Sequence, residues 1–208
     1  MKDSKKILVT GAAGFIGFHL SKRLIEEGHH VIGLDSINDY YDVKLKKARL
    51  KILDKINGSY DFVKHDISRK STVDMLKEIN PSFIVNLAAN AGVRYSIKNP
   101  RIYVKNNIFG FLNILEAAKE INLENLVYAS TSSVYGANTD YPFSEKKGVD
   151  HPLQFYAVTK RTNELMAHAY ASLFNIKSTG LRFFTVYGPW GRPDMALFLF
   201  TKNILKNK

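Results

Sequence analysis

Hydrophobic residues along the chain follow two patterns in alternating segments, one typical of strands and one typical of helices. Short runs rich in β-branched and aromatic residues predict strands at 6–10, 30–35, 61–66, 83–89, 126–130 and 178–184. Between them, apolar residues three and four positions apart predict helices at 15–27, 43–56, 72–79, 100–121 and 153–174, with a further helix within 194–208. Strands that alternate with helices are joined by crossover connections. The sequence therefore predicts an α/β fold, a doubly wound parallel sheet flanked by helices.

A glycine-rich turn links the first predicted strand to the first predicted helix. Gly11, Gly14 and Gly17 suit a tight turn, a close approach of a pyrophosphate and close strand–helix packing. The helix that opens with Phe15 and Ile16 then directs its N-terminus at the phosphates. These features together predict a Rossmann-type dinucleotide site, whereas a lone glycine motif would also fit an ordinary tight turn.

Further cofactor contacts are expected at the ends of the following strands. Asp35 ends the second strand, 18 residues after Gly17 (35 − 17). Its carboxylate would accept hydrogen bonds from the adenosine ribose and repel a 2′-phosphate, which favours NAD over NADP. Asp66 and Ile67 follow the third strand, where an adenine could lie. The fourth strand ends in small and apolar residues that leave room for the cofactor: Leu87, Ala88 and Ala89.

Tyr156 and Lys160 stand one helical turn apart, on the same face of the helix predicted at 153–174. A free phenol, with a pKa near 10, is a poor base at neutral pH. An ammonium about 5 Å away, at an effective dielectric of about 20, favours the phenolate by roughly 3 kcal/mol, or about two pKa units. The positive nicotinamide ring of NAD⁺ would act in the same direction. The sequence thus predicts that Tyr156 is a phenolate near pH 7 and accepts a proton from a sugar hydroxyl. Two surface residues of an ordinary helix are the alternative.

Several segments together resemble one enzyme family. They are the GxxGxxG turn, "NLAANAGVRYSIKNP", "VYASTSSVYG", "YAVTK" and "GLRFFTVYGPWGRPDMA". This combination resembles the extended short-chain dehydrogenase/reductase family of NAD-dependent epimerases and dehydratases. Within that family it is most similar to the UDP-glucuronate 4-epimerases, and it extends over nearly the whole chain.

The resemblance implies roles for individual residues. Thr131 would hydrogen-bond the reacting sugar oxygen beside Tyr156, and Lys160 would also hold the nicotinamide ribose. Ser132 and Ser133 would face the rest of the sugar ring. The remaining implied residues are Thr185 and Arg192 for a sugar carboxylate, Arg94 for the sugar or phosphates, and Asn107 at the cofactor site.

The expected activity is inversion of C4 of a UDP-sugar through a transient 4-keto intermediate, with UDP-glucuronate converted to UDP-galacturonate. Related dehydratases and decarboxylases carry an acidic residue where Ser132 and Ser133 stand, and both residues here are neutral. A UDP-glucose 4-epimerase, a sugar-nucleotide dehydratase and a truncated, non-catalytic NAD-binding module remain as alternatives.

The amino-acid composition limits the kinds of partner and the cellular location that we expect for this protein. The net charge of +11 favours anionic partners, and the densest basic run, at 44–55, predicts an amphipathic helix with a solvated basic face rather than a nucleic-acid site. No apolar run reaches the length of about 18 residues that a membrane helix needs. The chain has no cysteine, and its histidines show no metal-ligand spacing. We therefore expect a cytoplasmic protein with neither a nucleic-acid nor a membrane partner and no bound metal.

Domain and subunit organisation are expected to follow the resembled family. Residues 1–180 would form the dinucleotide-binding domain, and 181–208 the start of an incomplete substrate-binding domain. Because most of the uridine and diphosphate contacts would then be missing, turnover by residues 1–208 alone is expected to be weak or absent. The helices at 100–121 and 153–174 would pair two subunits into a homodimer through a four-helix bundle.

Overall fold

A computed structural model describes residues 3–207 as a six-stranded parallel sheet with strand order β3-β2-β1-β4-β5-β6. The strands are β1 (Lys6–Thr10), β2 (His30–Asp35), β3 (Tyr60–Lys64), β4 (Phe83–Asn86), β5 (Asn125–Thr131) and β6 (Ser178–Phe183). The order reverses between β1 and β4, so the loops that follow these two strands part above the sheet and leave a crevice between them. The predicted α/β fold is confirmed.

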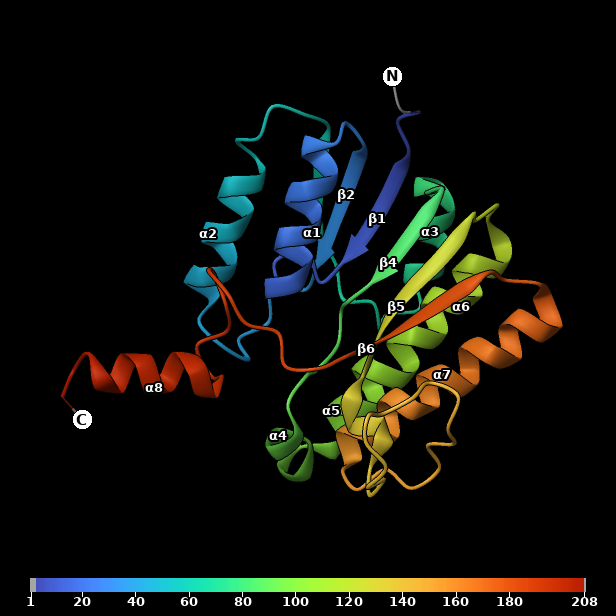
Figure 1. Ribbon diagram of the computed structural model, residues 1–208. Coiled ribbons are helices and arrows are strands. Elements are labelled where there is room, and N and C mark those ends of the chain that lie inside the picture. Colours follow the sequence, from blue (N-terminus) through green and yellow to red (C-terminus); the bar gives the residue numbers. More distant parts are fainter. Residues whose placement is uncertain (1–2, 208) are drawn as a thin grey trace.

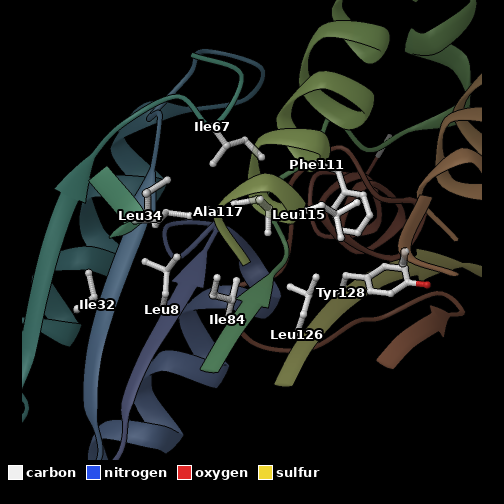
Figure 2. Close-up of a cluster of buried hydrophobic side chains, with 13 residues drawn as sticks. Leu8, Ile32, Leu34, Ile67, Ile84, Phe111, Leu115, Ala117, Leu126 and Tyr128 are labelled. Carbon is white, nitrogen blue, oxygen red and sulfur yellow. The ribbon is translucent and has the colours of Figure 1, made fainter. Parts of the chain in front are cut away.

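Helices cover both faces of the sheet (Figure 1). The helices α1 (Phe15–Glu26) and α2 (Val43–Leu53) lie on one face, and α3 (Thr72–Ile79), α6 (Gly110–Glu120) and α7 (Phe155–Phe174) lie on the other. Alternate residues of each strand serve the two layers. In β1, Ile7 and Val9 pack towards α1, while Leu8 packs with Phe111 and Leu115 of α6. Figure 2 shows the second of these layers, in which side chains of the central strands and of α6 form one buried cluster.

The region from 93 to 121 is more divided than its pattern predicts. The region begins with a short helix, α4 (Val93–Lys98). The single helix expected at 100–121 then consists of three consecutive parts, which are α5 (Pro100–Tyr103), a π-helical segment η1 (Val104–Phe109), and α6. One further turn, the 3₁₀ segment η2 (Ser132–Tyr135), follows β5 directly. Single π-helical turns are frequent at functional sites, and η1 carries Asn107.

The basic run on α2 differs from its prediction as a solvated face. Lys44, Lys47 and Lys51 are exposed, but Lys46 is 4% exposed and Arg49 is fully buried. Lys46 donates to the backbone carbonyl and the side-chain oxygen of Asn38, each at 2.7 Å. The run is therefore amphipathic, but two of its charges belong to the interior.

The last helix, α8 (Ala196–Ile204), has no buried residue and extends away from the sheet (Figure 1). It exposes a series of large apolar side chains, namely Leu197, Phe198, Leu199, Phe200 and Ile204. None of the helices within residues 3–207 combines the length and the apolar character needed to span a bilayer.

Candidate active site

One cleft of about 920 Å³ opens at the carboxyl ends of the strands. Its walls come from the glycine turn, the ends of β2, β4 and β5, the start of α7, and the segment after β6. Apart from Asn107, every residue predicted for the site lines it. These residues are Gly11, Gly14, Phe15, Ile16, Gly17, Asp35, Asp66, Ile67, Leu87, Ala88, Ala89, Arg94, Thr131, Ser132, Ser133, Tyr156, Lys160, Thr185 and Arg192.

The glycine turn leaves no space for side chains. Gly11 has φ +73°, and a Cβ there would lie 2.9 Å from the backbone nitrogen of Ala88. A Cβ on Gly17 would lie 2.1 Å from the carbonyl oxygen of Gly11. Gly14 caps α1 without any side-chain hydrogen bond, so the first amides of this 12-residue helix are open to an acceptor in the cleft. The geometry is that of an anion-binding helix N-terminus.

Asp35 is 8% exposed and holds the turn from the neighbouring strand. Its Oδ2 accepts from the amide of Ala13 at 3.2 Å, and its Oδ1 accepts from the amide of Ile37 at 2.8 Å. Burial raises the pKa of Asp35, although these amides and the positive charges of Lys46 and Arg49 act in the opposite direction. Each carboxylate oxygen keeps a second lone pair for a hydroxyl donor.

Tyr156 begins the first turn of α7, where its amide donates to Ser96 Oγ at 3.2 Å. Burial raises the pKa of the phenol, and a side-chain hydrogen bond with Thr131 and the charge of Arg192 only partly offset this effect. In this structure Tyr156 is therefore a neutral phenol at pH 7. Desolvation here outweighs the nearby positive charge of Arg192. The phenolate expected with the positive ring of oxidised NAD beside Tyr156 stays a prediction.

Lys160 lies one turn further along α7 and is 4% exposed. Its Nζ donates to the carbonyl oxygen of Ala129 in β5 at 2.8 Å. Burial lowers the pKa of Lys160 to about 8. The two side chains share a helix face and the cleft, but the ammonium is directed at the strand rather than at the phenol.

Thr131 is the last residue of β5 and is 7% exposed. Its hydroxyl oxygen accepts from the amide of Ser133 at 3.2 Å and so caps η2. This cap fixes Ser132 and Ser133 on the wall of the cleft next to Tyr156. Three hydroxyl groups and one phenol therefore converge at the end of β5.

Arg192 reaches the cleft from the segment that follows β6. Its Nε and Nη2 donate to the two carboxylate oxygens of Asp194 at 3.0 and 2.5 Å, and its guanidinium lies 5.5 Å from the ring centre of Tyr40. Arg192 thus forms a bidentate pair with a carboxylate of the protein itself, that of Asp194. Thr185 and Arg94 also line the cleft and are exposed.

Asn107 is buried beneath the cleft rather than on its wall. Its side-chain oxygen accepts from the amide of Asn90 at 2.8 Å, and its Nδ2 donates to the carbonyl of Asn90 and to Thr159 Oγ1. The π-helical turn η1 therefore ties the segment after β4 to α7, which carries Tyr156. A direct contact between Asn107 and the cofactor stays a prediction.

Several residues of the cleft have no counterpart in the sequence-based prediction. Tyr40 and Tyr95 pack edge to face with ring centres 5.0 Å apart, and both line the cleft. Behind β5, Glu164 accepts two hydrogen bonds from Arg182, each at 2.9 Å, and one from Ser130 at 2.6 Å. The paired tyrosines in "NDYYD" were the one available signal, whereas the Glu164 network has no local pattern. Among residues 3–207, no three His, Asp or Glu side chains cluster as metal ligands.

Comparisons with known proteins agree with this geometry. The sequence profile of the NAD dependent epimerase/dehydratase family matches residues 7–208. Protein CapI of Staphylococcus aureus is 60% identical over 206 residues, which cover 98% of this chain and 60% of that protein. A probable UDP-glucuronate 4-epimerase of Rhizobium meliloti is 52% identical over 200 residues, or 96% of this chain and 58% of that protein.

A solved structure with the same fold carries ligands in its site. The UDP-glucuronic acid 4-epimerase of Bacillus cereus, in complex with UDP-glucuronic acid and NAD, superposes with a TM-score of 0.89 at 39% identity. The match covers 98% of this chain and 64% of that one. The chain thus spans about 60% of the length of the curated relatives that it matches.

Proposed function

The chain belongs to the NAD dependent epimerase/dehydratase family, and from this premise we propose that it binds NAD and inverts C4 of a UDP-sugar. The proposed reaction converts UDP-glucuronate to UDP-galacturonate through a transient 4-keto sugar. One observation carries the proposal: Tyr156 and Thr131 converge on the same cleft as the glycine turn and Arg192.

The residues of the cleft fit a dinucleotide. The uncapped N-terminus of α1 and the Cβ-free surface of Gly11 and Gly14 suit a pyrophosphate, and Asp35 retains lone pairs for ribose hydroxyls. Asp66 and Ile67 would hold the adenine side. The nicotinamide side would rest against the segment after β4 and against Lys160.

When bound, NAD would supply a hydride acceptor for C4 and return the hydride, so that no cofactor is consumed. Tyr156 takes the proton of the C4 hydroxyl and gives it back, while Thr131 orients the same oxygen. This role requires the pKa of Tyr156 to fall from its raised value. Arg192 already acts in that direction, and the positive ring of the oxidised cofactor would add to it.

The preference for a glucuronate rests on three features. Arg192 presents a planar pair of donors, which suits a carboxylate better than a neutral hydroxymethyl group. Thr185 lines the same cleft. Ser132 and Ser133 are neutral, so no acidic side chain beside Thr131 assists elimination or decarboxylation of the 4-keto acid. These features disfavour the dehydratase alternative, and the carboxylate fork disfavours a UDP-glucose epimerase.

Chromatography of the products tests the activity. Because the chain spans only part of the length of its relatives, we expect slow turnover, so the protein is used in stoichiometric amounts with UDP-glucuronate and NAD. UDP-galacturonate should form with the natural sequence and fall by at least about 10²-fold with Tyr156→Phe. A dehydrated or decarboxylated product would refute the proposal. Tight NAD binding with no reaction would support the non-catalytic alternative instead.

Calorimetric titration tests the cofactor site separately. Gly17→Ala places a Cβ 2.1 Å from the Gly11 carbonyl and should abolish measurable NAD binding, because the turn must open. Gly148→Ala is the matched control, since its Cβ would meet only the far end of a side chain at 3.3 Å. NADP should bind much more weakly than NAD because of Asp35. Equal affinity of Gly17→Ala for NAD would exclude this turn as the binding site.

Two proposals concern organisation. Residues 1–180 are proposed as the dinucleotide-binding domain and 181–208 as the first part of the substrate-binding domain, since the latter segment lines the cleft and is largely exposed. A homodimer is proposed through η1 and α7, because Phe109 and Leu165 are 55% and 54% exposed on these helices. Analytical ultracentrifugation should show a dimer that Leu165→Glu dissociates; an unchanged sedimentation coefficient would refute this interface.

A further inference from the structure

Arg49 is a fully buried guanidinium, and within residues 3–207 it hydrogen-bonds no carboxylate. It projects from α2 and binds three separate segments. Its Nη1 donates to the carbonyl of Ala13, in the glycine turn, at 2.8 Å and to the hydroxyl of Tyr41 at 2.7 Å. Its Nη2 donates to the carbonyl of Trp190 at 2.5 Å. Burial of a charge is costly, and stability alone would be served as well by an apolar side chain of similar length.

The segment that Arg49 binds is the one that carries Arg192. Trp190 lies only two residues before Arg192 and has φ +63°, a left-handed conformation that is unfavourable for a bulky residue. The carbonyl held by Arg49 is the carbonyl of this strained residue. On the other side, His19 Nε2 lies 2.9 Å from the carbonyl of Pro189, so α1 also contacts the loop. The backbone before Arg192 is thus fixed from both α1 and α2.

We propose that Arg49 is a positioning residue that fixes the loop 188–192, and with it Arg192, against the glycine turn. One planar guanidinium bridges Ala13 and Trp190 through two different nitrogens. The loop 188–192 therefore keeps a fixed position relative to the glycine turn, and Arg192 keeps its place on the wall of the cleft. The consequence for substrate specificity rests on the proposed function, whereas the consequence for the loop does not.

The fluorescence of Trp190 reports the loop directly, because it is the single tryptophan of the sequence. Its side chain is 41% exposed and lies 6.0 Å from the ring of Phe18, measured between ring centres. Arg49→Met removes every donor and keeps an apolar side chain of similar reach. We expect acrylamide quenching of Trp190 to increase about twofold, as the ring passes to nearly full exposure. Lys47→Met, on the exposed face of the same helix, should leave quenching unchanged.

If Arg49→Met does not show a cooperative melting transition, the same quenching measurement is made on Arg49→Lys. One ammonium cannot reproduce the planar bridge between the two carbonyls, so quenching should again increase, by less than in a folded Arg49→Met. Quenching equal to that of the natural sequence, in a folded variant, would overturn the positioning role whatever the substrate is.

Ligand affinity then separates this proposal from the proposed function. In Arg49→Met the affinity for UDP-glucuronate should fall about tenfold, with the affinity for UDP-glucose little changed, because only the glucuronate uses Arg192. Increased quenching with equal losses for both sugars would retain the positioning role and refute the carboxylate role of Arg192. Unchanged quenching with an intact preference for glucuronate would refute the role of Arg49 and leave the proposed function standing.

Discussion

Replacing Lys160 with methionine should stabilise the fold, because the cleft holds this ammonium at a cost. The side chain is 4% exposed, and its Nζ donates a hydrogen bond to the carbonyl of Ala129. Burial lowers its pKa to about 8. At pH 7 the group is protonated in both the folded and the unfolded chain, so the folded state carries the full desolvation penalty.

The size of this penalty follows from the shift. A fall from 10.5 to about 8 corresponds to about 3 kcal/mol at pH 7, at 1.36 kcal/mol per pKa unit. The unfolded chain binds more protons between pH 8 and 10.5, so stability rises with pH across this window. At pH 9.5 about 1 kcal/mol of the penalty remains, and above pH 10.5 it disappears. Lys160→Met should therefore gain about 3 kcal/mol at pH 7, less about 1 kcal/mol for the lost hydrogen bond.

Urea unfolding at pH 7 and pH 9.5 measures the free energy of unfolding of both proteins. Other groups titrate in the same range, but they are common to both proteins and cancel in the difference. Lys177→Met, an exposed lysine, is the control and should differ little at either pH. A destabilised Lys160→Met, or a gain that does not shrink at pH 9.5, would refute the reasoning. Confirmation would indicate that Lys160 is kept at the expense of stability, as expected for a group with a functional role.

Two further predictions concern charges around the cleft. Glu164→Gln should lower the free energy of unfolding by about 2–3 kcal/mol at pH 7, because it weakens a bidentate pair with Arg182. Burial raises the pKa of Glu164, but the bonds from Arg182 and Ser130 lower it overall. This loss should therefore shrink as pH falls below the ordinary glutamate pKa and vanish below the lowered pKa of the folded protein; a loss that persists in strong acid would contradict the assignment. Asp194→Asn should raise the affinity for UDP-glucuronate about fivefold, since it frees the guanidinium of Arg192 from a partly exposed pair worth about 1 kcal/mol. Titration calorimetry with UDP-glucose as the control checks this, and an unchanged affinity would show that Asp194 does not compete.

Local pattern was sufficient for most of the fold. β1, β2 and α3 have the predicted bounds because each is a strongly patterned run that a turn signal closes. α4 was missed since six residues between Gly92 and Asn99 are too few to display a helical period. The predicted single helix at 100–121 is interrupted by a π-helical turn, which has no signature in the hydrophobic pattern.

Residues of the cleft could be predicted where a recognisable motif falls at the end of a predicted strand or helix. They could not be predicted where their position depends on a partner that is far away in the sequence. The hydrophobic pattern defines the ends of the elements that carry the glycine turn, Asp35, and the pair of Tyr156 and Lys160. Arg49 was grouped with solvated lysines because its partner Trp190 is 141 positions away. The direction of the Lys160 ammonium was equally hidden, since spacing along a helix fixes the face but not the acceptor that a long side chain finds.

The central claim is that C4 is oxidised and reduced at the same carbon within this cleft, and isotope retention tests it most directly. UDP-glucuronate labelled with deuterium at C4 is incubated with the protein and NAD in ordinary water, and the UDP-galacturonate formed is examined by NMR and mass spectrometry. Because the proposed hydride transfer to NAD and back would take place at C4 without exchange with solvent, the product should keep its deuterium at C4. Loss of the label to solvent, or inversion at a carbon other than C4, would contradict the account.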